Sequence, residues 1–231
     1  MRDWFFTVAP ELRDGLTLTL DGDLPKRDWL DAPRSPRLSE SDGQIRTVVP
    51  GRPIGLHPWV MGELAAQGVH VHFYGDFTQD LWKDWIAKVR EVAAGHLHLH
   101  PNVDHRGWVA EFSRYDEGWL HFFKSQNGGD ARRMTFDDMN YPARIGPLVA
   151  AGLPLLQGDN AGAIVAAQNL ARERDLGLLF NDAAGLRAQL SDEARMAALR
   201  ESVWRQREQF TFDSHADRLI GFFREVIESK T

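Results

Sequence analysis

The chain has no cysteine among its 231 residues. This absence excludes a disulfide scaffold, a thiolate metal ligand and a cysteine nucleophile. It is compatible with a reducing compartment, and we expect a cytoplasmic protein. No apolar run approaches the ~20 residues that a membrane-spanning helix requires. The stretch from Met1 to Phe6 is too short and too soon interrupted by charge for a signal peptide, so we expect neither a leader nor a transmembrane segment.

An excess of basic charge is also missing. The formal net charge is −6 and the pI is ≈ 5.8. Proteins that bind nucleic acids concentrate Lys and Arg on one surface, where these residues neutralise phosphates. We therefore expect no nucleic-acid partner.

Three segments of the chain differ in pattern. Residues 1–44 are rich in proline, serine and Asp-Gly pairs, and only Leu16 to Leu20 alternates like a strand, which predicts a linker- or hinge-like segment with one possible strand. Residues 45–209 alternate between strand-like and helix-like stretches and are expected to form one domain. Residues 210–231 are predicted to form a C-terminal amphipathic helix.

Within residues 45–209, strands and helices follow one another with short connections. This order is typical of a parallel sheet with right-handed crossovers, so we predict a doubly wound, mostly parallel Rossmann-like α/β sheet with helices on both faces. The strands are expected at 45–50, 69–74, 96–100, 117–123, from about 153, and at 176–180; the helices are expected at 58–66, 79–94, 108–115, 142–152, 163–174, from 183, and at 191–207.

The most informative stretch runs from Asn140 to Gly162. Pro142 can open a helix at its first position, where a missing N–H costs nothing, and apolar residues follow at helical spacing until Gly152 ends the helix. An extended segment and a polar, glycine-containing turn, 157–162, come next. In an open α/β sheet, such turns lie at the carboxyl ends of strands, where ligands bind.

The sequence P-x-R-I-x-x-L-V-A-A-G-L-P-L-L at 142–156, followed by D-N-A-G at 159–162, resembles the C-terminal, nucleotide-sugar-binding half of GT-B-fold glycosyltransferases of the retaining bacterial type. The resemblance is specific from Arg144 to Pro154 and weaker elsewhere. It implies a donor domain that moves a sugar from a nucleotide-diphosphate sugar to an acceptor, without a further cofactor. It also implies a separate N-terminal acceptor-binding domain that this chain lacks, and without which the chain is inactive.

The resemblance assigns the leaving-group contacts to two places. Arg52, in a Gly-Arg turn after the first strand, is implied to be catalytic by neutralising the charge that grows on the departing nucleotide diphosphate, and Gly51 lets the backbone approach the ligand. The family has a lysine a few residues later; here His57 either replaces it or the contact is missing. At the helix start, Arg144 and outward-pointing amides are expected to bind phosphate, because the fork of Arg donors and the helix dipole both favour anions. An arginine on a solvated face is the alternative.

Further substrate contacts are expected at other strand ends. The turn 159–162 resembles the sugar and phosphate contact loop of the family, although a plain helix N-cap is an alternative. The expected substrate-binding residues beyond Gly51, His57 and Arg144 are Gly75, Asn102, Val103, His121, Asp138, Asn140, Tyr141, Asp159, Asn160, Ala161 and Gly162.

One departure from the family concerns its pair of glutamates, of which the second grips the ribose hydroxyls. Met139 and Pro147 occupy those positions, and neither can accept a hydroxyl proton. Asp137 or Asp138 could reach the sugar instead. A GT-B-like binding or scaffold module without catalytic activity therefore stays open as an alternative, as does a nucleotide-sugar epimerase.

The run His96-Leu97-His98-Leu99-His100 raises a metal-binding hypothesis, because alternate residues of a strand share one face. No carboxylate cluster nearby in sequence completes a tetrahedral site, however. We therefore expect strand histidines without a metal, and we interpret His70 and His72 in the same way.

Overall fold

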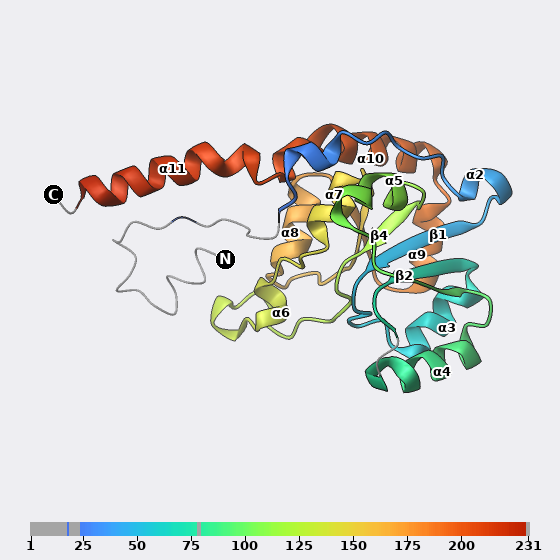
Figure 1. The fold of residues 1–231 in the computed structure, drawn as a ribbon. Helices are drawn as coiled ribbons and strands as arrows, with labels where there is room; N and C mark the ends of the chain where they lie inside the picture. The colour runs from blue at the N-terminus through green and yellow to red at the C-terminus, as the bar shows by residue number, and fades with distance from the viewer. Residues whose placement is uncertain (1–17, 19–23, 78–79, 230–231) are drawn as a thin grey trace.

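The computed structural model describes residue 18 and residues 24–77 and 80–229. Six strands form one sheet with helices on both faces (Figure 1). Apart from Leu18, the strand expected at 16–20 lies outside the described residues. None of the helices in the described part of the chain combines the length and apolar character needed to cross a membrane.

The sheet is parallel throughout and has the order β3-β2-β1-β4-β5-β6, which confirms the predicted doubly wound α/β fold. The order reverses between β1 and β4, and a crevice opens at such a switch point outside the carboxyl ends of the strands. The strands are β1 Ile45–Pro50, β2 Val69–Tyr74, β3 Leu97–His100, β4 Glu117–Trp119, β5 Leu155–Gly158 and β6 Gly177–Phe180.

Helices cover both faces of this sheet. Side chains of α3, α4 and α9 pack in one apolar cluster, side chains of α5, α7 and α8 pack in a second, and α10 contributes to both. The helices are α2 Ser39–Asp42, α3 Pro58–Ala66, α4 Lys83–Val92, α5 Trp108–Phe112, α6 Phe136–Met139, α7 Ile145–Ala150, α8 Ala166–Glu173, α9 Ala183–Leu190, α10 Glu193–Gln206 and α11 Asp213–Glu228.

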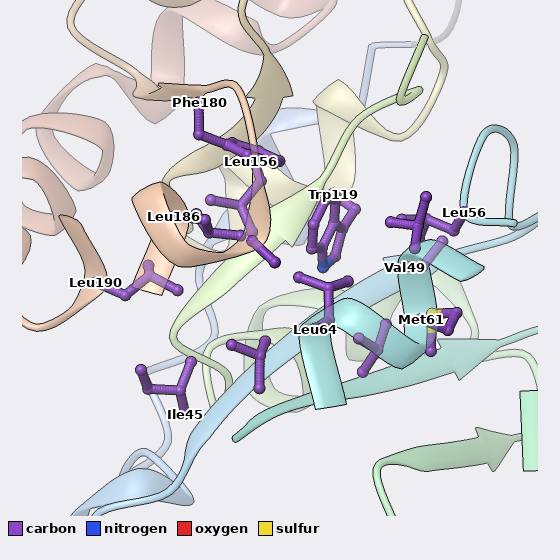
Figure 2. Close-up of a cluster of buried hydrophobic side chains, with 14 of the residues drawn as sticks. Ile45, Val49, Leu56, Met61, Leu64, Trp119, Leu156, Phe180, Leu186 and Leu190 are labelled. Atoms are coloured by element: carbon purple, nitrogen blue, oxygen red, sulfur yellow. The ribbon is translucent and has the colours of Figure 1, made fainter. Parts of the chain in front are cut away.

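The first cluster is centred on Trp119 (Figure 2). Its indole is fully buried, its Nε1 donates to Thr47 Oγ1 at 2.8 Å, and its ring meets the Phe180 ring edge-on at 5.6 Å. A buried indole needs such a hydrogen-bond partner, because an unpaired donor in the core is costly. This contact joins β1, β4 and β6 across the middle of the sheet.

The first residues of the described range 24–77 lie beside the start of α11, outside this core. Leu30 is buried against Val109, and the N–H of Phe212 donates to the carbonyl of Pro25 at 2.9 Å. From that point α11 projects away from the rest of the chain without a buried residue (Figure 1). The three-segment division of the chain stays a prediction.

Several element boundaries differ from the predicted ones. Helix α7 begins at Ile145 and not at Pro142, because the Ile145 N–H closes a turn on the Pro142 carbonyl at 2.9 Å. Strand β5 begins at Leu155, after a proline that cannot donate to the ladder. Helix α8 begins at Ala166, three residues later than expected, and β4 ends at Trp119, four residues earlier.

Gly118 lets α7 lie close to the sheet. A Cβ at this position would lie 2.2 Å from Leu148 Cδ2, and Leu148 is fully buried. We predict that Gly118→Ala lowers the free energy of unfolding by about 1–3 kcal/mol through overpacking. Gly221→Ala on the exposed α11 is the matched control, because a Cβ there meets nothing within 4 Å and should raise helix stability by about 1 kcal/mol or less. Chemical denaturation measures both; equal effects would contradict the close packing at Gly118.

Candidate functional site

The candidate site lies at the switch point, where β1 and β4 end. Gly51 turns the chain after β1 with φ 92°, a conformation that favours glycine, and its N–H donates to the Tyr74 carbonyl at 2.7 Å. The turn that follows is fixed against the end of β4, because the Phe122 N–H donates to Ile54 O at 3.2 Å and a Cβ on Gly55 would lie 1.5 Å from Phe122 O. The crevice wall is therefore set by backbone contacts.

Arg144 lies at the switch point as the N-cap residue of α7. Its side chain crosses to the turn after β1, where Nη2 donates to the carbonyl of Arg52 at 2.5 Å. The residue is only 7% exposed, and its Nη1 is buried without a hydrogen-bond partner. Burial, and then the charge of Arg52, lower the pKa of Arg144 to about 10, so the guanidinium stays charged at neutral pH.

His121 lies within electrostatic range of these two arginines. It follows β4 and is partly buried, and burial together with the charges of Arg144 and Arg52 lowers its pKa to about 4. Arg52 itself is exposed. Among the described residues, no carboxylate forms an ion pair with Arg52 or Arg144. The crevice therefore holds two arginine charges and a neutral imidazole, an arrangement that attracts an anion.

Two positions at the helix start offer no free amide. The Ile145 N–H is bonded to Pro142 O, and Pro147, at the third helical position, has no N–H. The helix has six residues and its first turn is buried. That helix amides receive the phosphate stays a prediction, and the charged groups at this place are side chains.

Three other residues predicted near this helix have different settings. Asp138 is buried, and its carboxylate closes a capping box with Thr135 at the start of α6, so it is not presented to the crevice. Asn140 ends α6, and its N–H donates to Phe136 O at 2.9 Å. Tyr141 is partly buried and packs against the second apolar cluster. Asn140 and Tyr141 thus lead the chain from α6 into the Arg144 turn.

The ends of β2 and β3 form a separate part of the same sheet edge. Gly75 and Asn102 line a cavity of ≈ 500 Å³ together with Phe77, Leu99 and His100. Val103 instead packs against the second apolar cluster. The structure therefore brings Gly75 and Asn102 together and leaves Val103 in the core.

The turn 159–162 is held by an ordered loop that precedes it. Asn160 is buried, its Oδ1 accepts from the Ser125 N–H at 2.8 Å, and its Nδ2 donates to Gly158 O at 3.1 Å. Asn127, fully buried, donates to Ile164 O at 2.9 Å and accepts from the Ile164 N–H at 3.0 Å.

The Asn160 side chain neither caps a helix nor is free to contact a sugar or a phosphate. The N-cap residue of α8 is Val165, so the turn does not cap that helix, and the Asn160 side chain is occupied by the loop. Asp159 pairs with Arg172 at 3.5 Å. Ala161 and Gly162 are exposed. His57 is exposed as well, at the N-cap of α3, where its ring stacks on that of Trp59.

The strand histidines form a cluster that sequence reasoning treated as separate runs. In the register of β2 and β3, His72 lies beside His98, so both histidine runs share one face. His70 Nδ1 lies 3.1 Å from His98 Nε2, and His72 Nδ1 lies 2.9 Å from His100 Nε2. We call His70, His72, His98 and His100 the histidine array. Among the described residues, no group of three or more His, Asp or Glu could hold a metal ion.

The environment of the histidine array favours the neutral form of its rings. Burial, and then the neighbouring imidazoles, lower the pKa of His98 to about 4, and burial lowers the pKa of the other three as well. Beyond the array, Tyr115 Oη lies 3.4 Å from His72 Nδ1 and 2.6 Å from Tyr74 Oη, which donates to Glu111. Each contact within the array thus joins two neutral imidazoles.

Comparison with known proteins supports the fold. No protein-family model and no curated protein matches the chain. Among solved structures, the chain is similar to accessory secretory protein 1, 2 and 3 of Streptococcus pneumoniae, with 12% identity and a TM-score of 0.50 over 97% of this chain and 41% of that chain. It also matches a putative UDP-N-acetylglucosamine 2-epimerase from Listeria monocytogenes, with 13% identity and a TM-score of 0.42 over 86% of this chain and 50% of that one.

At such identities a likeness shows the fold alone. The first match supports the Rossmann-like, GT-B-like fold expected from the sequence. The chain spans no more than half the length of either protein.

We predict that acidification destabilises the protein through the histidine array. The folded pKa of His98 lies below the unfolded value of about 6.5, so the unfolded state binds more protons as the pH falls from about 6.5 towards 4. The contribution of neutral His98 to the free energy of unfolding is therefore fully present above this pH range and is lost as the pH falls through it. His98→Gln should flatten the dependence, as measured by urea denaturation at several pH values. Parallel curves for the two proteins would contradict the prediction.

Proposed function

We propose that this chain is the donor-binding domain of a GT-B-like glycosyltransferase, and that the crevice at the end of β1 and β4 binds the diphosphate of a nucleotide sugar. One observation carries the proposal: Arg144 is buried at this place with a charged guanidinium whose Nη1 lacks a partner. A phosphate oxygen would supply both the missing acceptor and the missing negative charge.

The energetics support an anion at this position. Burying a charge without a counter-ion costs several kcal/mol, and an unsatisfied buried donor costs about 1–3 kcal/mol more. The Arg52 carbonyl relieves part of this cost through Nη2. The remaining cost of burying the Arg144 charge is relieved when a negatively charged group binds to it. The affinity for an anion is therefore raised by the cost that the free protein already carries.

Each of the three groups has a distinct proposed role. Arg144 holds the phosphate from the floor, and exposed Arg52 approaches the outer oxygens at the rim, where the leaving diphosphate gains charge during sugar transfer. His121 is neutral at physiological pH and offers one ring N–H without a proton transfer. Together they would stabilise the leaving group without a metal ion.

The remainder of the donor is placed along the same edge. The base is proposed to occupy the cavity beside Gly75 and Asn102, where Phe77 and Leu99 supply apolar surface. The sugar is proposed to point towards the exposed backbone of Ala161 and Gly162. The acceptor would then approach from a second domain, which is a proposed partner outside this chain.

A second candidate is a binding or scaffold module that keeps the GT-B-like fold and has no transfer activity. It is favoured by Met139 and Pro147 at the glutamate positions, and by the use of Asp138 as a buried cap. Of the two carboxylates predicted for the ribose, Asp138 is thus used as a cap and Asp137 is exposed on α6. Activity of a full-length protein that survives substitution of both Arg52 and Arg144 would favour this candidate.

Calorimetric titration with UDP, GDP and ADP tests the ligand class. We predict millimolar or tighter binding of at least one nucleotide, and a loss of about 10- to 100-fold in Arg144→Gln and in Arg52→Gln, since each substitution removes a charge-assisted hydrogen bond. Arg52 is exposed, so its variant should fold normally.

The matched control is Arg132→Gln, which changes an exposed arginine paired with Asp130 outside the crevice and should leave affinity unchanged. An equal loss in all three variants would show non-specific attraction. Absence of heat with every nucleotide, in a protein that also carries its second domain, would overturn the proposal.

A further inference from the structure

A second cavity opens at the opposite edge of the sheet. Its volume is ≈ 750 Å³, and its wall includes Ile45 and Glu117, the first residues of β1 and β4. The other walls come from residues 34–43, the end of α9 and the first turns of α10. It therefore lies at the amino ends of the strands, away from the switch-point crevice, and we call it the amino-edge cavity.

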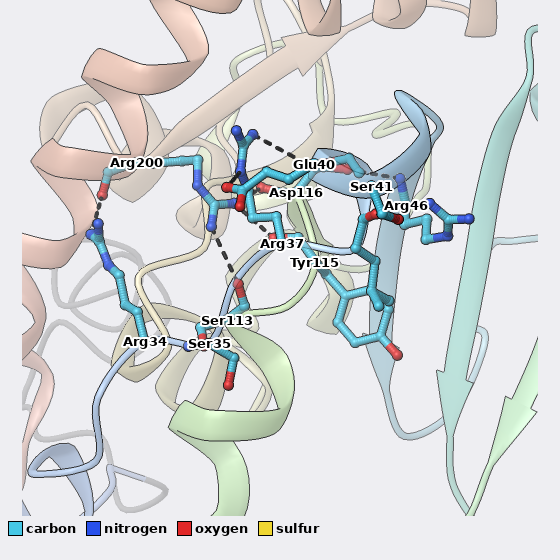
Figure 3. A network of polar contacts seen from close by, with 12 residues as sticks. Arg34, Ser35, Arg37, Glu40, Ser41, Arg46, Ser113, Tyr115, Asp116 and Arg200 are labelled. Atoms are coloured by element: carbon cyan, nitrogen blue, oxygen red, sulfur yellow. Dashed lines mark hydrogen bonds and ion pairs between the residues drawn. The ribbon is translucent and has the colours of Figure 1, made fainter.

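A satisfied polar network fixes the shape of this cavity (Figure 3). Arg200 donates to the carbonyls of Tyr115 at 2.7 Å and Asp116 at 2.6 Å. The Asp116 carboxylate accepts from Ser39 Oγ at 2.5 Å and from the Arg46 N–H at 2.9 Å. These contacts join the segment before β1 to α10 and β4, so the cavity has a rigid polar wall.

The Glu117 carboxyl in this wall has an oxygen without a hydrogen-bond partner. It is 2% exposed, and its Oε2 is buried with no hydrogen bond. Burial, and then the charge of Asp116, raise the pKa of Glu117 well above its usual value, and the arginines at 37 and 200 do not offset this. Burial without a hydrogen-bond partner favours the protonated form of this carboxyl, whose O–H can donate to a ligand.

The charges around the cavity are unequally paired. Arg34 pairs with Glu201, and Arg37 pairs with Glu40 and Asp116. Arg200 binds only carbonyl oxygens, and within the described chain Arg187 takes part in no ion pair. Two guanidinium charges and one carboxylate, that of Glu193, thus border the cavity without an ion-pair partner in the described chain.

We infer that the amino-edge cavity binds a small organic or inorganic oxyanion, a carboxylate or a phosphate, which pairs with Arg187 and accepts a hydrogen bond from Glu117. An oxyanion matches a guanidinium fork and an O–H donor. The volume admits a tricarboxylate or a sugar phosphate. This site is independent of the nucleotide crevice on the other edge.

Calorimetry with citrate and with inorganic phosphate tests the inference and separates the two sources of oxyanion. The wild-type chain should bind at least one of them, and Arg187→Gln should weaken that binding at least about tenfold. Glu117→Gln keeps a donor and should retain binding within about threefold, while Glu117→Leu should lose it. Circular dichroism verifies that each variant is folded.

Two control variants locate the site. Arg218→Gln, on the exposed α11, removes the same charge elsewhere and should change nothing. Arg144→Gln should also leave this binding intact, even if nucleotide binding is lost. The inference is overturned if neither anion binds, if Arg187→Gln and Arg218→Gln act alike, or if Arg144→Gln abolishes the signal.

Discussion

The arrangement of the whole site depends on one buried, uncompensated guanidinium. Arg144 reaches across the switch point to the Arg52 carbonyl and so connects the start of α7 to the turn after β1. A charge in this position is costly unless a partner reaches it, and the free chain supplies only a carbonyl. The crevice geometry is therefore fixed by the same group that makes the crevice attract anions.

Packing in the core sets the position of the Arg144 side chain. Because Gly118 has no side chain, Leu148 lies directly against β4, and α7 approaches the sheet closely. Gly51 and Gly55 shape the facing turn through a positive φ and a close approach to Phe122. Small residues in the sheet and turn thus bring two arginines near each other, although like charges repel, and the apolar clusters on both faces hold them there.

The sequence allowed the fold to be predicted more completely than the site. The alternation of strand-like and helix-like stretches gave the parallel sheet, because short crossovers admit few topologies. The start of α7 was misplaced, since the fixed φ of Pro142 suits a turn as well as a first helical turn. The capping role of Asp138 and the loop contacts of Asn160 depend on segments that meet only in three dimensions. The pairing of His72 with His98 required the register of β2 and β3, and the neutral state of Glu117 required its burial.

The most direct measurement of the central claim is a high-resolution crystal structure of the chain with UDP at millimolar concentration. We expect a phosphate oxygen within hydrogen-bond distance of Arg144 Nη1, with Arg52 on its outer side and His121 beside it. A nucleotide bound elsewhere, with Nη1 satisfied by a protein group or an ordered water, would contradict the claim that this guanidinium is the anion receptor of the fold.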